Sequence, residues 1–392
     1  MKQKSILFLT NAYPDFESSY RGVFIKKMAL CLMEVGYRIS VVTPKIYRRS
    51  PCFEKQDNIL VYRFPFFAGD KLLIEHKNIP YFRMVIYYLT GLFLGAYATL
   101  TNQCDLIHVH WAIPTGPIGI ILGTLVRKPV IVTVHGSDLR MALEGSPVLK
   151  RIFVWVCKRA WHIHVVSEKM RSHIEKSGIP QEKISVWPMG IDETFLQSGK
   201  NRKKRSDGCP VTVVSTRNLL PIYDVSCLIR AIPLILKEEL GARFLIAGEG
   251  SERENLEREA RKLDVRVRSS LQFVGRVAHD QMPTLLAQAD IYISTSLADG
   301  TSVSLMEALA AGAFPVVTDI PANREWITDG VNGFLVPVGN ERKLADRVIE
   351  AIRNTALLER AIEMNQVHVM EKANWEANIP RMRAVYAGVL KA

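Results

Sequence analysis

The segment "IYISTSLADGTSVSLMEALAAGAFPVVTD", residues 291–319, shows a pattern that recurs along this chain. Two short apolar runs, at 291–296 and 314–319, flank an Ala-rich stretch of helix-forming residues. Short, continuous runs rich in Val and Ile are typical of parallel strands that are buried on both faces. The segment therefore predicts a strand–helix–strand unit of a parallel sheet.

Similar apolar runs alternate with amphipathic segments in both halves of the 392-residue chain. The first half contains "SILFLT", "RISVVTP", "LIHVHW", "VIVTVHG" and "IHVVS", and the second adds "VTVVSTR", "RFLIAGEG" and "LQFVG". A polar, basic segment, "LQSGKNRKKRSDGCP", separates the two sets and is typical of an exposed linker. We predict an α/β protein with two Rossmann-like, doubly wound domains that face each other across a cleft. The predicted parts are an N-terminal domain at 1–198, a linker at 199–209, a C-terminal domain at 210–370, and a last helix at 371–392 that packs back on the N-terminal domain.

Positive charge is concentrated in the first half of the chain. The formal net charge is +12, and residues 1–200 contain 26 Lys and Arg against 15 Asp and Glu. This half is expected to face an anionic partner, with a phospholipid surface, a lipid diphosphate and a nucleic acid as candidates and scattered solubilising lysines as the alternative. The basic residues 202–205 are interpreted as part of a solvated linker rather than as a nucleic-acid tag.

One segment is long and apolar enough to cross a bilayer. Residues 84–104 carry no charge over 21 residues, but they include Thr, Gly, Asn and Gln and lead directly into a strand-like run. We favour a buried or membrane-facing helix of a folded domain over a true span. The first apolar run is too short for a signal peptide, and six cysteines without a C-x-x-C pair indicate reduced thiols. We expect a cytoplasmic protein, with the inner face of the cytoplasmic membrane as a candidate location.

Two common enzyme classes lack their motifs. The dinucleotide fingerprint G-x-G-x-x-G is missing, since "AGEGSERE" has Gly248 and Gly250 but no third glycine. The G-x-S-x-G elbow of many hydrolases is also missing. His108 and His110 share one side of a strand but have no further metal ligands at matching spacing. We interpret His108 as a core histidine and place His110 nearer the cleft.

Several polar residues follow strands, at the edge where open α/β sheets bind ligands. His135 ends a strand beside a glycine and is placed to hydrogen-bond a sugar hydroxyl or a phosphate, whereas Asp138 is interpreted as a helix cap. Arg217 follows a strand in the second half and suits a diphosphate. The turn at Gly248 allows the backbone to approach a ligand closely.

The 291–319 segment also contains the start of a helix. Ser304 and Glu307 match the S-x-x-E capping box, which explains Glu307 but neither Asp299 nor the hydroxyls of Thr301 and Ser302. A helix start with small residues offers free N–H groups to an anion, and carboxylates accept hydrogen bonds from sugar hydroxyls. The segment therefore predicts a site for a nucleotide-sugar.

Nearly the whole chain resembles the retaining glycosyltransferases of family 4, which have the GT-B fold. The resemblance rests on "RGVFIKKMALCLMEVGYRISVVTP", "VHGSDL", "VVSEKMRSHIEKSGIPQEKISVWPMGIDETF", "STRNLLPIYDVSCLIRAI", "LIAGEGSERENLE", "FVGRV" and "DGTSVSLMEALAAGAFPVVTDIPANREWITDGVNGFLV". The last block is the most specific, because it carries the family's two acids separated by seven residues.

The resemblance implies roles for matching residues. Glu307 would hydrogen-bond the nucleotide ribose, and Asp299 would contact the transferred sugar. Arg217 would bind the diphosphate, and His135 would lie beside the transferred sugar. The other predicted donor-side positions, which would border the phosphates and the base, are Gly248, Arg276, Val277, Thr301, Ser302 and Val303. The predicted acceptor side comprises Gly22, His110 and His135, and the predicted catalytic set comprises His135, Arg217 and Asp299.

The sequence departs from the family pattern at two positions. The first acid is usually Glu and here is Asp299, which is shorter by one methylene. The family usually has a lysine shortly after the arginine as a second diphosphate cation, and here that region reads Pro221-Ile222-Tyr223. Arg324 is a candidate to supply the second charge.

We therefore expect a retaining enzyme that moves a hexose from a UDP- or GDP-sugar to a hydroxyl of a lipid-linked or surface-polysaccharide saccharide. The alternatives are an NDP-sugar 2-epimerase of the same fold and an inactive nucleotide-sugar-binding protein. No cofactor or metal is expected, because the charge of the leaving group would fall on Arg217 and the helix dipole. The expected partners are the donor, the acceptor and, as a candidate, an anionic membrane surface, but no nucleic acid.

Overall fold

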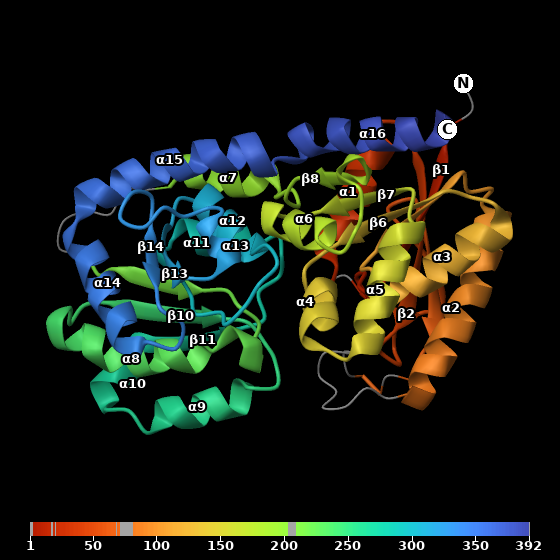
Figure 1. Cartoon of the computed structure of the whole chain (residues 1–392). Helices are drawn as coiled ribbons and strands as arrows, with labels where there is room; N and C mark the ends of the chain where they lie inside the picture. Colours follow the sequence, from red (N-terminus) through yellow and green to blue (C-terminus); the bar gives the residue numbers. More distant parts are fainter. Residues whose placement is uncertain are drawn as a thin grey trace. The chain divides into compact units, whose positions relative to one another are not determined.

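The computed structural model describes residues 3–16, 19, 21–67, 69–70, 81–202 and 209–391. The chain forms two compact units, each with one twisted sheet between layers of helices (Figure 1). The first unit comprises Met1–Gly190 and Trp375–Ala392, and the second comprises Ile191–Asn374. The predicted α/β class with two doubly wound domains is confirmed.

The first unit has an eight-stranded sheet in the order β3-β4-β2-β1-β5-β6-β7-β8, in which only β3 runs antiparallel to its neighbour. Every residue of β1, β5 and β6 is buried, as expected for parallel strands covered on both faces. The strands are β1 Ser5–Thr10, β2 Arg38–Lys45, β3 Phe53–Gln56, β4 Ile59–Pro65, β5 Leu106–His110, β6 Val130–Val134, β7 His162–Val165 and β8 Ile184–Val186.

Helices cover both faces of this sheet. The helices α2, α3 and α5 pack side by side in one layer, whereas α1 packs against α16 (Figure 1). Right-handed crossovers produce this division, because the chain runs from β1 to β2 in one direction and from β5 to β7 in the other. The helices are α1 Val23–Glu34, α2 Tyr81–Thr101, α3 Thr115–Val126, α4 Ser137–Glu144, α5 Pro147–Arg159, α6 Glu168–Glu175 and α16 Trp375–Lys391, with the short η2 at Gln181–Lys183.

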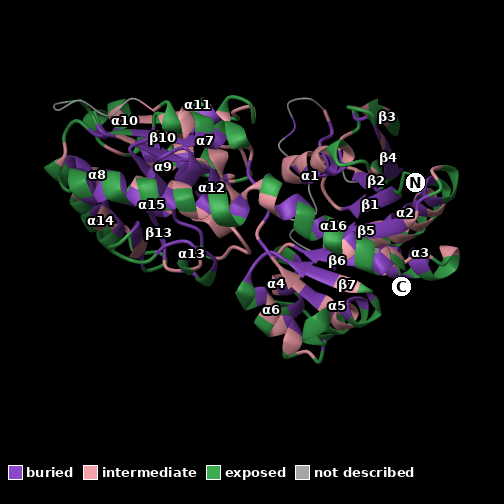
Figure 2. Cartoon of the chain, turned by 90° about the horizontal axis from the view of Figure 1, so that it is seen from above, coloured by how far each residue is buried: buried purple, intermediate pink, exposed green. Residues whose placement is uncertain are grey.

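The second unit has a six-stranded parallel sheet in the order β11-β10-β9-β12-β13-β14. Its strands lie in the interior, while the helices expose their outer faces (Figure 2). The strands are β9 Thr212–Ser215, β10 Arg243–Ala247, β11 Leu271–Gly275, β12 Ile291–Ser294, β13 Phe314–Thr318 and β14 Phe334–Val336. The helices are α7 Glu193–Lys200, η3 Pro221–Tyr223, α8 Val225–Glu238, α9 Arg253–Arg261, α10 Val265–Ser270, α11 Met282–Ala287, α12 Val303–Ala310, α13 Pro321–Arg324, α14 Glu341–Arg353 and α15 Thr355–Ala373.

The first boundary between the units differs from the predicted one at 198. The chain enters the second unit after Gly190, because Phe195 and Leu196 of α7 belong to the apolar core of that unit. Part of the predicted linker at 199–209 also belongs there, since Arg202 forms an ion pair with Asp290 at 2.7 Å. Residues 203–208 of that linker lie outside the described residues.

The second boundary also differs, by a few residues, from the predicted start of the last helix at 371. The chain returns to the first unit at Trp375, where α16 begins. A Cβ on Gly190 would lie 2.3 Å from the Trp375 ring, so a glycine is required where the two passages of the chain meet. The start of α16 at Trp375 is therefore fixed by the contact with Gly190, which no local sequence pattern indicates.

Candidate active site

Arg217 lies where the strand order of the second sheet reverses. β9 and β12 are neighbours in the middle of that sheet, and the loops that follow them carry Arg217 and Asp299. In doubly wound sheets, ligands bind at this switch point, outside the carboxyl ends of the strands. The two residues that the sequence analysis placed on the diphosphate and the sugar therefore share one edge of the sheet.

The guanidinium of Arg217 is buried and makes polar contacts on two of its three nitrogens. Nη1 donates to the hydroxyls of Ser302 at 2.9 Å and Ser304 at 2.7 Å, and Nη2 donates to Asp299 at 2.7 Å. The guanidinium carbon lies 4.1 Å from the centre of the Tyr223 ring. The third nitrogen, Nε, is buried without a hydrogen-bond partner in the described part of the chain. Since a buried, unsatisfied donor is costly, an acceptor atom from a ligand would stabilise this arrangement.

The Asp299 carboxylate is already engaged at both oxygens. Oδ2 accepts from Arg217, and Oδ1 accepts from the amide of Gly300 at 2.8 Å. The pairing with Arg217 was not predicted, because the two residues are 82 positions apart and nothing in either motif indicates the contact. The sugar contact that the resemblance implies for Asp299 stays a prediction.

The helix α12 begins at a different hydroxyl from the one predicted. Its N-cap is Ser302, whose Oγ accepts from the amide of Leu305 at 3.2 Å. The predicted Ser304–Glu307 capping box is wrong, because the Ser304 hydroxyl instead accepts from Arg217 and from the Tyr292 hydroxyl at 3.0 Å. Among the described residues, the amides of Val303 and Ser304 have no acceptor, so they remain available to an anion.

Glu307 is a buried carboxyl in the second turn of α12. It is 9% exposed and makes no hydrogen bond or ion pair with any residue in the described ranges. Burial raises the pKa of Glu307 to about 8, although the nearby Arg217 acts to lower it. Such a carboxyl is already desolvated, so that hydroxyl groups of a ligand can bind it with little further loss of hydration.

Replacing Glu307 by Gln is expected to stabilise the protein at alkaline pH. The carboxyl ionises near pH 4.5 when unfolded, but its pKa is about 8 when folded, so stability is lost as the pH rises between these values. Glutamine cannot ionise, so the variant avoids a loss of about 5 kcal/mol at pH 9. The free energy of unfolding in urea at pH 5 and pH 9 measures the difference. Equal pH profiles for the two proteins would contradict a buried, protonated Glu307.

Gly248 allows the loop after β10 to pack on the loop after β9. A Cβ on Gly248 would lie 2.3 Å from the carbonyl oxygen of Arg217, and one on Gly250 would lie 2.2 Å from that of Leu219. Glycine is required at both positions because two backbones meet there. The structure thus gives Gly248 a role in holding Arg217, while its approach to a ligand stays a prediction.

The remaining donor-side candidates also follow strands of the second sheet and lie along the same edge of it. Arg276 and Val277 follow β11, the edge strand beside β10. Arg324 lies on α13, after β13, and its guanidinium is paired with Asp319 at 2.5 and 2.8 Å. Tyr223, in the region where a lysine is usual, lies against Arg217 and so adds packing but no second charge.

The acceptor-side candidates lie at the switch point of the first sheet. β1 and β5 are neighbours where that strand order reverses. The loop after β1 leads to Gly22, β5 ends at His110, and His135 directly follows β6. The first unit therefore gathers its predicted residues by the same topological rule as the second.

His135 is surrounded by aromatic rings. The ring centres of Trp111 and Phe24 lie 4.3 and 5.4 Å away, and Nε2 lies 3.2 Å from Nδ1 of His110. Burial lowers the pKa of His135 to about 3, and His164 adds to the effect. His135 is therefore a neutral imidazole near pH 7, able to donate or accept a hydrogen bond but not to carry a positive charge.

His110 is fully buried, which does not fit the direct acceptor contact predicted for it. Its position at the end of β5 is as expected, but its ring stacks on His108 at 4.3 Å and packs against Phe8 at 4.9 Å. The strand end is therefore covered by packing that the sequence does not reveal. His110 touches the site through its contact with His135.

His108 is confirmed as a core histidine, and it belongs to a chain of buried hydrogen bonds. Nδ1 and Nε2 lie 2.7 Å from the Tyr386 hydroxyl and the Thr133 Oγ1, respectively. Thr133 Oγ1 lies 3.2 Å from Nδ1 of His164, and Nε2 of His164 lies 2.9 Å from the Trp187 carbonyl. A carbonyl only accepts, so every proton points the same way, from Tyr386 toward Trp187. This chain ties α16 to β5, β6 and β7.

The first unit is expected to lose stability as the pH falls below 6.5. Burial lowers the pKa of four histidines, which stay neutral when folded but take up protons when unfolded: His108, His110, His135 and His164. For a depressed histidine pKa, stability is lost as pH falls below the unfolded value, here by up to about 5 kcal/mol per pH unit for all four groups. Unfolding free energies at pH 7 and pH 5 test this, with His173→Gln, at a half-buried surface histidine, as the control for His164→Gln. The prediction fails if the free energy is the same at both pH values.

Asp138 organises the backbone around His135. Its Oδ1 accepts from the amides of His135 at 3.2 Å and Gly136 at 2.9 Å, and Oδ2 accepts from Ala112 at 2.7 Å. The predicted capping role is wrong, because the cap position is Gly136, which has no side-chain cap hydrogen bond, and Asp138 lies inside the first turn of α4. Asp138 also joins the loops after β5 and β6, a role that was not predicted.

Gly22 is closely packed rather than freely exposed. It caps α1 with a φ of 61°, and a Cβ there would lie 2.3 Å from the Ala12 carbonyl oxygen. Next to it, Arg21 forms a buried ion pair with Asp15 at 2.5 Å and donates to the Asn11 carbonyl at 2.9 Å. The sequence analysis missed this pair, because a charged residue in a loop gives no local sign of burial.

A metal centre has no counterpart in the part of the chain that the structure describes. No three His, Cys, Asp or Glu side chains lie close enough there to hold an ion.

The contacts of Tyr223, Tyr292 and Ser304 were not predicted from the sequence. The Ser304 hydroxyl had been assigned to a helix cap. A hydroxyl that serves a distant arginine has no signature in sequence.

Comparison with known proteins agrees with this arrangement. The model of Glycosyltransferase Family 4 matches residues 22–195, and that of Glycosyl transferases group 1 matches residues 210–354. The phosphatidyl-myo-inositol mannosyltransferase of Mycobacterium leprae is 26% identical over 296 residues, which are 73% of this chain and 74% of that protein.

Two solved structures share the fold over their whole length. Sucrose-phosphate synthase from Thermosynechococcus elongatus has a TM-score of 0.81 at 15% identity and covers 99% of both chains. HepE from Anabaena, in complex with UDP-glucose, has a TM-score of 0.74 at 18% identity and covers 98% of this chain and 99% of that one. Two doubly wound domains of this kind define the GT-B fold. The chain belongs to glycosyltransferase family 4.

Proposed function

We propose that this glycosyltransferase is a retaining hexosyltransferase that uses a UDP- or GDP-sugar. The observation that carries the proposal is the buried Arg217, whose Nε has no partner among the described residues and which lies beside the amides of Val303 and Ser304, for which the same residues offer no acceptor. A fixed guanidinium and a helix N-terminus together suit a diphosphate. The related HepE, whose structure holds UDP-glucose, supports a donor of this class.

The other donor-side residues follow from this placement. Glu307 accepts hydrogen bonds from the ribose, and its buried, unpaired carboxyl supports that role. Asp299 contacts the transferred sugar while it holds Arg217. The backbone at Arg276 and Val277 borders the base. The small residues at the edge of the phosphates are Gly248, Thr301, Ser302 and Val303.

In the proposed reaction, the bond between the anomeric carbon and the diphosphate oxygen breaks while the acceptor oxygen bonds to the same face of the sugar. The acceptor hydroxyl gives its proton to an oxygen of the departing phosphate. The negative charge that develops on the diphosphate is stabilised by Arg217 and the first amides of α12. Neutral His135 hydrogen-bonds the transferred sugar. No metal takes part in this scheme.

The proposed acceptor is a lipid-linked or surface-polysaccharide saccharide, reached at the inner face of the cytoplasmic membrane. The mannosyltransferase relative is named for a phospholipid acceptor, phosphatidyl-myo-inositol, which supports an acceptor with a lipid part. The excess of basic residues in the first half of the chain supports an anionic surface nearby. Gly22 and His135 lie on the acceptor side in this scheme.

A donor panel tests the proposal. The protein is incubated with UDP- and GDP-hexoses, with and without a membrane lipid extract, and release of the nucleotide and the configuration of the product are measured. Acceptor-dependent release with retention is expected. Isomerisation of the donor sugar without an acceptor would instead indicate a 2-epimerase, and nucleotide binding without any turnover would indicate an inactive binding protein.

A further inference from the structure

The helix α2 is both part of the folded core and exposed along one face. Within the described ranges it is the one helix that is long and apolar enough to cross a membrane, at Phe82–Thr101. Only 28% of this apolar segment is buried. Its inner side packs on α3, where a Cβ on Gly91 would lie 2.7 Å from Ile118 and one on Gly95 would lie 2.9 Å from Leu122. A helix held in this way stays with its domain, so its outer face needs another explanation.

The outer face of α2 is apolar along its whole length. Its exposed large side chains, which we call the α2 stripe, recur every three or four residues and therefore share one face. At 1.5 Å per residue the stripe extends about 27 Å. Phe82 and Phe93 are 78% and 76% exposed. The stripe comprises Phe82, Val85, Leu89, Phe93, Tyr97 and Leu100. An exposed apolar patch of this size marks a site of association.

The α2 stripe continues into an apolar groove. Leu89, Phe93 and Tyr97 also line a hollow of about 640 Å³, together with Phe53 of β3 and Tyr62 of β4. Its walls are mostly aromatic and aliphatic side chains, with Arg63 and Thr90 as the polar exceptions, and they suit a hydrocarbon chain better than a polar ligand. The stripe and the groove therefore present a continuous surface to the same occupant.

The layer that carries the stripe has charge of one sign only. The sequences of α2, α3 and α5 contain no acidic residue. α2 contains one basic residue, Arg83, and α5 contains four, Lys150, Arg151, Lys158 and Arg159. Exposed apolar side chains also continue across the layer, at Leu125 of α3 and Trp155 of α5. An apolar face flanked by lysines and arginines is typical of helices that lie on an anionic bilayer.

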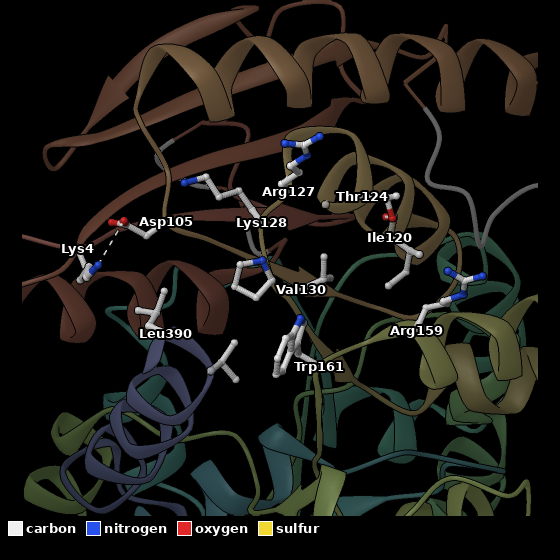
Figure 3. A pocket seen from close by; sticks show the side chains of 13 residues that line it. Lys4, Asp105, Ile120, Thr124, Arg127, Lys128, Val130, Arg159, Trp161 and Leu390 are labelled. Carbon is white, nitrogen blue, oxygen red and sulfur yellow. Dashed lines mark hydrogen bonds and ion pairs between the residues drawn. The ribbon is translucent and has the colours of Figure 1, made fainter. Parts of the chain in front are cut away.

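A basic pocket lies at the end of this layer (Figure 3). It has a volume of about 540 Å³ and is lined by the last turn of α3 and by the residues that precede β6 and β7. Lys4 is paired there with Asp105 at 3.4 Å, but Arg127, Lys128 and Arg159 have no partner for their charges among the described residues. Trp161, which is 51% exposed, lies beside them. Unpaired cations next to an exposed tryptophan suit the phosphates of lipid headgroups.

We propose that the face formed by α2, α3 and α5 docks on an anionic lipid bilayer. The α2 stripe lies in the headgroup region with the helix axis along the surface, and the basic pocket binds lipid phosphates. The docking face gives the lipid-linked acceptor a route to the enzyme, and in that respect it rests on the proposed function. Bilayer binding itself is measured without any sugar donor, so the two proposals can fail separately.

Vesicle flotation of the full-length protein tests the docking face. Binding is measured to vesicles of phosphatidylcholine alone and to vesicles that also contain phosphatidylglycerol. The double variant Leu89→Glu/Phe93→Glu is expected to lower the partition coefficient at least about tenfold. Leu240→Glu/Val265→Glu is the matched control, because both residues are exposed and apolar but lie in the second unit, and it is expected to bind like the wild type.

A second pair of variants tests the basic pocket. Arg127→Gln/Arg159→Gln is expected to lower binding about tenfold on phosphatidylglycerol vesicles and to leave binding to phosphatidylcholine unchanged. The exposed residues Arg266 and Arg268 of α10 provide a control with the same change in net charge, Arg266→Gln/Arg268→Gln. An equal loss in the control would show that overall charge, and not this pocket, determines binding.

Three results would overturn the proposal. The first is wild-type protein that floats with neither vesicle. The second is a wild-type dimer that Leu89→Glu/Phe93→Glu converts to a monomer without any change in vesicle binding, since a second copy would then cover the α2 stripe. The third is binding that resists an alkaline carbonate wash, which would indicate a membrane-spanning helix. A cooperative thermal unfolding transition, measured without any nucleotide, shows in each case that the variant is folded.

Discussion

Replacing Arg217 by methionine is expected to lower kcat/KM for the nucleotide-sugar by about 10³-fold. The guanidinium is the buried cation at the switch point of the second sheet, and it contacts Ser302, Ser304 and Asp299 at once. A charged donor aimed at the departing diphosphate acts most strongly in the transition state, so kcat should fall along with affinity. Initial rates over a range of donor concentrations, with acceptor at saturation, measure both effects.

Arg217→Lys separates charge from geometry. Lysine keeps the positive charge but cannot make the forked contacts or stack on Tyr223, so we expect an activity between those of the wild type and Arg217→Met. Arg324→Met is the matched control: Arg324 is paired with Asp319 and 60% exposed, so a loss below about tenfold is expected there. A larger loss for Arg324→Met than for Arg217→Met would mean that the diphosphate arginine has been wrongly assigned.

The pairing with Asp299 sharpens this test. If Asp299 serves only to hold Arg217, Asp299→Asn and Arg217→Met together should be no worse than Arg217→Met alone. If Asp299 also contacts the sugar, the double variant should lose further activity, because two separate contacts have been removed. The second result is expected from the proposed function.

Replacing His135 by alanine is expected to lower transfer about 10²-fold while the affinity for UDP stays unchanged. His135 belongs to the first unit and Arg217 to the second, so the loss of His135 leaves the proposed nucleotide contacts of the second unit in place. Because burial keeps the imidazole neutral, its loss removes a hydrogen bond rather than a charge. The effect on kcat should therefore not depend on pH between 6 and 8.

Transfer kinetics and a UDP titration of the same preparation check this result. His173→Ala is the control, since that histidine lies half-buried on α6 and its ring bonds to the Lys169 carbonyl of its own helix at 2.8 Å. His110→Ala should lower transfer less than His135→Ala, because the buried His110 acts through its contact with His135. A His135→Ala variant that loses UDP affinity instead of turnover would contradict the acceptor-side placement.

The sequence by itself determined the order of the elements and, for each of the two sheets, the edge at which its candidate residues lie. Short, continuous runs of Val and Ile indicate parallel strands that are buried on both faces. The residues that directly follow the strands of one parallel sheet lie at the same edge of that sheet. For this reason Arg217 and His135 could be placed from their positions after strands, whereas Gly22 was placed by the family resemblance alone. The family resemblance then added their roles.

The tertiary structure alone decided which side chains pair and which are buried. Arg217 and Asp299 meet across 82 positions, His108 bonds to Tyr386 across 278, and Ser304 turns from a predicted cap into a support for the arginine. Such contacts depend on loop conformations and on helices that return from far along the chain. The same holds for α2, whose sequence favours a buried or membrane-facing helix over a membrane span but does not show which of its sides is buried. Only the packing of Gly91 and Gly95 on α3 shows which side faces the fold and which side is left to solvent, because burial is a property of the whole assembled unit and not of any one segment.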